Sequence, residues 1–238
     1  MRLKLRSAIA LLVWAALTGC PVRPPVPAPQ PAAAPQAVAA HLGTPYEIAA
    51  NQSWLVILVY RGGTLASAGH NHLIASHELA GTFYVPADPL EASFELRLPV
   101  ASLTVDEESL RAAQQSPDFP PGIPETARTG TREHMLGPDQ LDVAHSPQII
   151  LRATRLEAAQ PAAAGALVAH VLVSLRGAEH PLRVAVHYER TADTLVAAGQ
   201  TTLRQTELGI TPYSAMLGAL QVKDELQVQF RIVAHAAR

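Results

Sequence analysis

The sequence lacks most of the residues and motifs from which enzymes build reactive sites. It has one cysteine, and only 5% of its 238 residues are aromatic. It contains no Gly-x-Ser-x-Gly elbow, no phosphate-cradling glycine loop and no His-Glu-x-x-His pair. Catalysis would need an unfamiliar site, so we predict that this protein is not an enzyme.

The lone cysteine, Cys20, follows a segment with the order of a secretory signal. Three basic residues precede an apolar run over residues 8–17, which is too short to span a bilayer. Residues 17–20, Leu-Thr-Gly-Cys, resemble a bacterial lipobox, in which the signal is cut before the cysteine and the cysteine is acylated. We predict a signal peptide over residues 1–19 and a lipid anchor on Cys20. The alternative is a soluble periplasmic protein whose signal ends near a cysteine.

Anchoring also explains why a single cysteine is present. Cys20 cannot form an intramolecular disulfide, and a free thiol would invite mispairing in an oxidising compartment. The next residue is Pro21 and not aspartate, so nothing argues for retention in the inner membrane. We therefore expect a lipoprotein of the bacterial envelope that faces the periplasm, with the outer membrane favoured over the inner.

Excess positive charge is also missing. Removal of residues 1–19 leaves 15 Lys and Arg against 20 Asp and Glu, a formal balance of about −5. No run of basic residues interleaved with aromatics offsets this balance, so we expect no nucleic-acid partner.

Residues 20–45 are rich in proline and alanine and have no periodic apolar pattern, which predicts a linker that spaces the domain from the membrane. The domain itself, residues 46–238, reads as strands of period two with no amphipathic helix of ten or more residues. The expected strands are Trp54–Tyr60, Ala66–Val85 with a bend, Phe94–Val100, Gln148–Leu156, Leu167–Leu175, Leu182–Arg190, Thr194–Arg204 and Leu226–Ile232.

Eight strands in sequential antiparallel order favour a closed barrel, because closure removes unpaired edges. We predict an all-β fold built on an eight-stranded antiparallel barrel, with a two-sheet sandwich as the alternative. The stretch Thr104–Ser146 contains five prolines and breaks the strand rhythm. We interpret it as a lid or a long loop insert with a short helix.

Three segments resemble motifs of the YceI-like family. Ser174–Leu182 is similar to the family's hairpin, Thr206–Ile210 to the turn before its closing strand, and Ser102–Asp106 to a strand that runs into a charged connection. The resemblance covers roughly Ser53–Ala234. It implies a lipocalin-like barrel, export to the periplasm, and a long apolar ligand such as a polyisoprenoid. The enlarged proline-rich connection and the segment Gly69–His72 depart from the commonest form and indicate a divergent branch.

His70 and His72 are the first candidates for chemistry. Two residues apart on a strand, they project from one face and suit one Zn, Cu or Ni ion. His134 is the expected third ligand, with Glu133 or Asp142 as alternatives. A structural alternative is that His70 and Asn71 bond to backbone groups at a bend after Gly69. A further alternative is that these residues contact the headgroup of a ligand.

Arg128 and Arg132, with nearby Thr129 and Thr131, are candidates to grip a phosphate at the barrel mouth, because guanidinium binds such groups with two parallel hydrogen bonds. The alternative is a solvated loop. The acidic run at residues 106–108 is typical of a helix start or an exposed turn, and we assign it no role.

The sequence thus predicts a lipid-anchored binding protein whose partners are an apolar ligand, held in the barrel, and a membrane, reached through the lipid on Cys20. The first alternative is a metal-binding or envelope-stress accessory protein that holds a divalent ion with His70, His72 and His134. The second is a purely structural envelope protein.

Overall fold

A computed structural model describes residues 42–161 and 163–237. The predicted signal peptide, Cys20 and most of the predicted linker lie outside these residues, so they stay predictions. No helix in the described part is long and apolar enough to cross a membrane.

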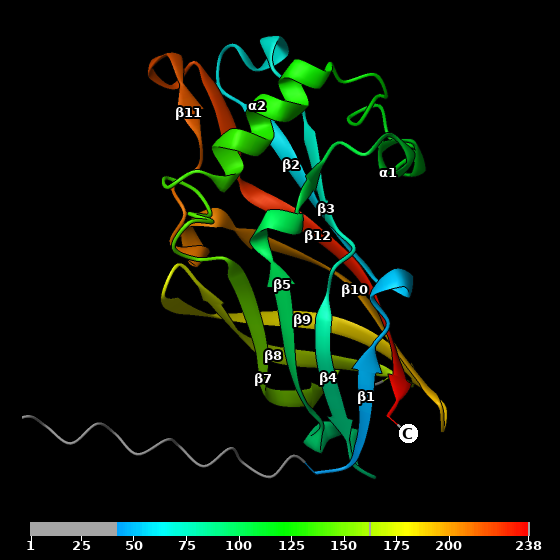
Figure 1. Cartoon of the computed structure of the whole chain (residues 1–238). Helices are drawn as coiled ribbons and strands as arrows, with labels where there is room; N and C mark the ends of the chain where they lie inside the picture. The colour runs from blue at the N-terminus through cyan, green and yellow to red at the C-terminus, as the bar shows by residue number, and fades with distance from the viewer. Residues whose placement is uncertain (1–41, 162, 238) are drawn as a thin grey trace, which may run out of the picture. The chain divides into compact units, whose positions relative to one another are not determined.

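Eight strands close into an antiparallel barrel (Figure 1). Ring closure comes from the last strand, which pairs with the first through Tyr46 and Ala236. This confirms the predicted fold. In order around the ring, the strands are β1 (Thr44–Ile48), β4 (Ala80–Val85), β5 (Ser93–Pro99), β7 (Gln148–Ala158), β8 (Ala166–Leu175), β9 (Ala178–Arg190), β10 (Thr194–Arg204) and β12 (Leu220–Ala236).

The 17-residue strand β12 joins this barrel to an extension of the sheet. One edge of β12 pairs with β10 along most of its length. The other edge pairs first with β2 (Trp54–Gly62) and then with β1. Beyond β2 the sheet continues through β3 (His72–Ser76) and β6 (Thr104–Val105), while β11 (Ser214–Ala215) pairs with the start of β12. One end of the barrel therefore opens into this extension, which we call the open end.

The insert between β5 and β7 leaves and re-enters the barrel at neighbouring points, because Pro99 pairs with Gln148. It contains β6 and the helices α1 (Glu108–Ala113) and α2 (Glu125–Leu136). In Figure 1 α2 lies at the open end, beside β11 and the cyan loop after β2. The 3₁₀ turns are Ala50–Gln52, Ala66–Ala68, Pro89–Glu91, Val100–Ser102, Gln205–Leu208 and Met216–Gly218.

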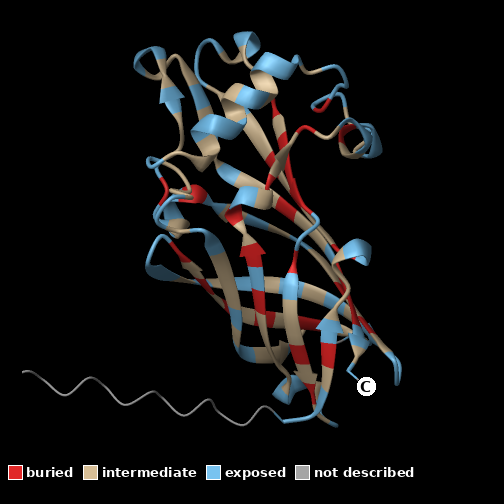
Figure 2. Cartoon of the chain, in the orientation of Figure 1, coloured by how far each residue is buried: buried red, intermediate tan, exposed pale blue. Residues whose placement is uncertain are grey.

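The opposite end, which we call the closed end, is filled by large apolar side chains. Tyr46, Phe83, Val85 and Leu96 are at least 92% buried and belong to one cluster. Buried positions run along the strands in Figure 2, whereas α2 has none. Every strand pairing and all three apolar clusters lie within residues 44–236, so residues 40–238 form a compact unit with a complete core.

Three local expectations need correction. The segment expected as one bent strand, Ala66–Val85, forms a 3₁₀ turn and two strands, because residues 77–79 interrupt the pairing and the chain then changes neighbours, from β2 and β6 to β1 and β5. The predicted linker ends too late, since β1 begins at Thr44. Helix α2 has 12 residues although no helix of that length was expected, because its sequence lacks a continuous apolar stripe.

Candidate functional site

A cavity of about 470 Å³ lies at the open end, between the barrel and α2. Its apolar walls come from the ends of the barrel strands and from the extension. None of its lining residues is an aspartate or a glutamate. The aliphatic side chains of these walls include Ile57 and Val59 on β2, Ile74 on β3, Leu98 on β5, Ile149 on β7, and Val173 and Leu175 on β8.

Helix α2 covers the cavity with one face. Its lining residues recur every four positions, as Ala127, Thr131 and Met135 do, which places them on one side of the helix. Gly130 lies on this face, and a side chain added there would meet nothing within 4 Å. The cover therefore leaves open space beneath it.

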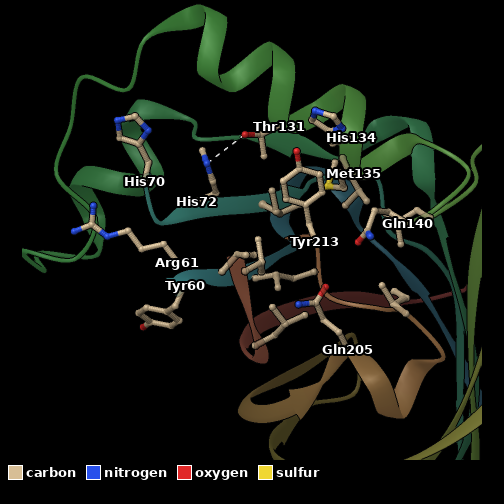
Figure 3. A pocket seen from close by; sticks show the side chains of 18 of the residues that line it. Tyr60, Arg61, His70, His72, Thr131, His134, Met135, Gln140, Gln205 and Tyr213 are labelled. Atoms are coloured by element: carbon tan, nitrogen blue, oxygen red, sulfur yellow. Dashed lines mark hydrogen bonds between the residues drawn. The ribbon is translucent and has the colours of Figure 1, made fainter. Parts of the chain in front are cut away.

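The polar side of the cavity is built around His72, at the start of β3. Its Nδ1 lies 2.6 Å from Oδ2 of Asp106, and its Nε2 lies 3.2 Å from the hydroxyl of Thr131 (Figure 3). A carboxylate only accepts, so the imidazole donates from Nδ1. In the neutral ring Nε2 then accepts from Thr131, and this bond ties α2 to β3.

Asp106 is the centre of a buried polar cluster. Its side chain is fully buried, and its backbone adopts a left-handed conformation with φ of 54°. The other oxygen, Oδ1, accepts from Arg111 Nη1 at 2.5 Å and from the backbone N–H of Leu73 at 2.8 Å. Arg111 is 1% exposed and also donates to the carbonyls of Asn71 and Pro120. The cluster therefore fastens α1 and the insert to β3.

The pKa of Asp106 reflects two opposing effects. Burial raises it, because the charged form loses hydration. Hydrogen bonds from His72 and from the N–H of Leu73, together with the charges of His72 and Arg111, outweigh burial and lower the pKa below its usual range. The carboxylate is thus held in its charged form, which is the form that can orient His72.

The structure does not assemble the predicted three-histidine metal site. Within residues 42–161 and 163–237, no group of three or more His, Cys, Asp or Glu side chains could hold a metal ion. His70 precedes β3 and is exposed, with its ring centre 6.2 Å from that of His72. His134 packs against the Tyr213 ring at 4.9 Å. Both ring nitrogens of His72 are already bonded.

Asn71 and the two arginines have structural partners. Asn71 is buried, accepts from the N–H of Arg61 and donates to the carbonyl of Asp118, which agrees with the backbone-bonding alternative. Arg132 donates to the carbonyls of Ala101 and Leu103, and Arg128 pairs with Glu125. Neither arginine lines the cavity, because both lie on a different side of α2 from the lining residues. The predicted phosphate grip is therefore not formed at the cavity.

Sequence reasoning missed Asp106 and Arg111. The acidic run was interpreted as a helix start or an exposed turn, and α1 does begin at Glu108. Asp106, however, points into the protein, which an acidic run does not reveal. The available signal was the segment Ser102–Asp106, which resembles the family pattern and ends on this residue.

The row Thr131–His72–Asp106 has the order of hydroxyl, imidazole and carboxylate that activates a nucleophile in hydrolases. Thr131, however, lies inside α2, where backbone N–H groups are committed to helix hydrogen bonds. Its N–H and that of its neighbour therefore cannot serve as oxyanion donors. The arrangement suits a role in positioning α2 and presenting a polar group to the cavity.

The closed ring of eight strands, opening onto an apolar cavity under a helical cover, defines a lipocalin-like barrel. Residues 46–234 match the YceI-like domain, and the chain belongs to this family. No curated protein matches the chain.

Solved structures that share the fold include the following two. BcnA of Burkholderia cenocepacia is 15% identical, with a TM-score of 0.56 over 79% of this chain and 99% of that one. A polyisoprenoid binding domain from Saccharophagus degradans, implicated in plant cell wall breakdown, is 11% identical, with a TM-score of 0.52 over 81% of this chain and 98% of that one. At these identities the likeness concerns the fold.

Proposed function

We propose that this protein is a periplasm-facing carrier, anchored through a lipid on Cys20, that holds the apolar chain of a polyisoprenoid or similar lipid in the cavity under α2. The observation that carries the proposal is the cavity itself, whose walls are mainly aliphatic and contain no carboxylate. Family membership supports it, as does the likeness to the Saccharophagus degradans domain described as polyisoprenoid binding.

The cavity also limits how much of a ligand can be enclosed. A volume of 470 Å³ falls within the range of about 300–1,000 Å³ that is typical of pockets for one small molecule. The closed end offers no continuation, because Tyr46, Phe83 and Leu96 fill it. Only the first few isoprene units would be enclosed, and the rest of a longer chain would extend out of the open end.

Affinity should therefore rise with chain length and then level off. Each methylene removed from water contributes roughly 0.8 kcal/mol before ordering costs are counted. A series of prenols of increasing length, titrated into residues 40–238 by calorimetry, tests this. An increase that never levels off would contradict the enclosed volume, and no binding of any prenol would contradict the carrier.

Blocking the cavity gives a sharper test. Native mass spectrometry of residues 40–238, purified without added lipid, with analysis of the organic extract, would show a bound lipid. We expect Gly130→Leu to lose most of this ligand, because the new side chain enters the open space under α2. Gly130→Ala is the matched control and should keep it. Equal occupancy in the two variants would place the ligand elsewhere.

The anchor needs its own experiment in cells. The lipobox-like segment and the lone cysteine support acylation of Cys20. We expect radiolabelled palmitate to be incorporated into the wild-type chain and to be found in the outer-membrane fraction. Cys20→Ser should release the protein into the soluble periplasmic fraction, whereas unchanged fractionation would refute the anchor.

A further inference from the structure

Three large apolar side chains are exposed together at the open end. Leu217 is fully exposed, Met216 is 68% exposed and Leu65 is 41% exposed. Only two other large apolar side chains of the described residues are this exposed, Leu42 and Leu90, and both lie near the closed end. We call Leu65, Met216 and Leu217 the apolar tip.

The two loops that carry the tip are fixed to each other. The N–H of Leu65 donates to the carbonyl of Ala219 at 2.8 Å. Gly63, with φ of 87°, lies so close to the second loop that an added Cβ would collide with the Ala219 carbonyl. Met216 and Leu217 both have φ near 54°, a left-handed conformation that is costly for residues other than glycine. The loop is thus held in a strained form that leaves both side chains in solvent.

The tip adjoins the cavity on both sides. Its first loop continues into Ala68 and His70, which line the cavity. Its second loop lies between Tyr213 and Leu220, which also line it. A surface that contacts the tip is therefore next to the cavity opening.

The two loops that carry the tip, with the strand ends that flank them, are basic. Residues 61–72 and 209–223 include Arg61 and Lys223 and contain no aspartate or glutamate. Helix α2, the other element at this end, is balanced, because Glu125 and Glu133 accompany Arg128 and Arg132. Cations on the strands beside protruding apolar side chains match an anionic bilayer, where the apolar side chains enter the interface and the cations meet lipid phosphates.

A protein partner fits less well. A stable protein interface buries on the order of 800 Å² on each partner, more than three side chains on two loops provide. We infer that the apolar tip enters the surface of an anionic phospholipid bilayer and brings the cavity opening to the lipid. The inference deepens the proposed carrier function, because it supplies the route by which an apolar ligand passes between bilayer and cavity without crossing water.

The test uses residues 40–238, which have a complete core and no anchor. The wild type should float with vesicles of phosphatidylethanolamine and phosphatidylglycerol. The double variant Met216→Ser/Leu217→Ser should bind about tenfold more weakly. The control Leu42→Ser/Leu90→Ser removes two exposed apolar side chains from the closed end and should bind as the wild type does. Thermal unfolding should be unchanged in both variants, because all four side chains are exposed.

A fluorescent probe reports insertion directly. Leu217→Trp places an indole at the tip, and its emission should shift to the blue when vesicles are added. An unshifted emission, absence of vesicle binding by the wild type, or equal loss in the tip and control variants would overturn the inference. Wild-type self-association that the tip variant abolishes, without vesicle binding, would overturn it in favour of a second copy of the chain.

Ligand occupancy separates this inference from the carrier proposal. The tip variant should retain its ligand in native mass spectrometry, because Met216 and Leu217 do not line the cavity. Vesicle binding by a domain that takes up no apolar ligand would support the membrane contact and refute the carrier. A domain that carries an apolar ligand but does not bind vesicles would support the carrier and refute the membrane contact.

Discussion

Different interactions stabilise the closed end and the open end of this molecule. At the closed end, Phe83 and Leu96 pack into a continuous apolar cluster. At the open end a cavity takes the place of such packing, and α2 has no buried residue. There Phe119, Met135 and Leu136 of the insert still pack against apolar side chains. Directional bonds add to this attachment: the Asp106 cluster, the bond between His72 and Thr131, and the two backbone bonds of Arg132.

The difference shows what an enclosed binding site demands. A cavity forfeits the close contacts that would otherwise order the elements around it. Directional hydrogen bonds can hold a cover in place without filling the space beneath it. Asp106 meets both needs: its hydrogen bonds fasten the insert to β3, and its side chain takes no space in the cavity.

Loss of the charge at Asp106 should have the largest effect. In Asp106→Asn the amide would place a donor against Arg111, His72 or the N–H of Leu73 and leave Arg111 buried without its counter-charge. We expect a loss of about 3–5 kcal/mol in unfolding free energy, measured by urea denaturation. Glu95→Gln, which breaks exposed pairs with Arg97 and Arg152, is the control and should cost less than about 1 kcal/mol. Similar losses would mean that the cluster is not what holds the insert.

Two leucines on β5 test the contrast in packing. Leu96 and Leu98 are both at least 95% buried, but only Leu98 lines the cavity. Leu96→Ala should cost about 3–4 kcal/mol and Leu98→Ala about 2 kcal/mol, because Leu98 already lacks contacts on its cavity side. Equal values in urea denaturation would indicate that the cavity is filled in solution, and organic extraction would then identify the contents.

The pH dependence of stability should follow Asp106. Its pKa in the folded state lies below that of the unfolded chain, which is about 3.9. The unfolded chain therefore binds the proton first as pH falls. The stabilisation is complete above the unfolded pKa and is lost as pH falls through the folded pKa. The difference between wild type and Asp106→Asn should shrink below about pH 4, and a difference that stays constant down to pH 2 would argue against this assignment.

The smallest effect contrasts two glycines. Gly130→Ala should stabilise the protein by about 0.5–1 kcal/mol, because alanine favours the helix and its Cβ meets only open space. Gly199→Ala should destabilise it, because the added Cβ would meet the carbonyl of Ala185 and the ring of Phe230. Thermal unfolding measures both changes: the unfolding temperature should rise for Gly130→Ala and fall for Gly199→Ala. A lower unfolding temperature for Gly130→Ala would show that the space under α2 is occupied.

Most of the barrel could be predicted from the sequence, because its strands have one face in the core and one in solvent. The expected strand Thr194–Arg204 coincides with β10. The short strands β6 and β11 could not be predicted, because two residues carry no periodicity. Helix α2 was missed for a related reason: its inner face borders a cavity, so threonine, glycine and histidine stand where a packed helix would have aliphatic residues.

The site was harder to predict than the fold. The sequence singled out His72 as a candidate ligand and named Thr131 beside the arginines, but it assigned the two residues, which contact each other at the cavity, to different sites. Their contact spans 59 residues of sequence and depends on how the insert folds back over β3. Spacing along a strand relates His70 to His72. It cannot show that the hydrogen-bond partners of His72, Asp106 and Thr131, come from the distant insert.

The pairing of Pro99 with Gln148 separates the cover from the barrel along the chain. The barrel would be complete if a short turn joined these two residues, so the cover is an addition to a finished scaffold. Closure entropy grows only slowly with the length of such an addition. Evolution can therefore exchange, lengthen or remove the cover and so change which molecules enter, while the register of the surrounding strands stays as it was.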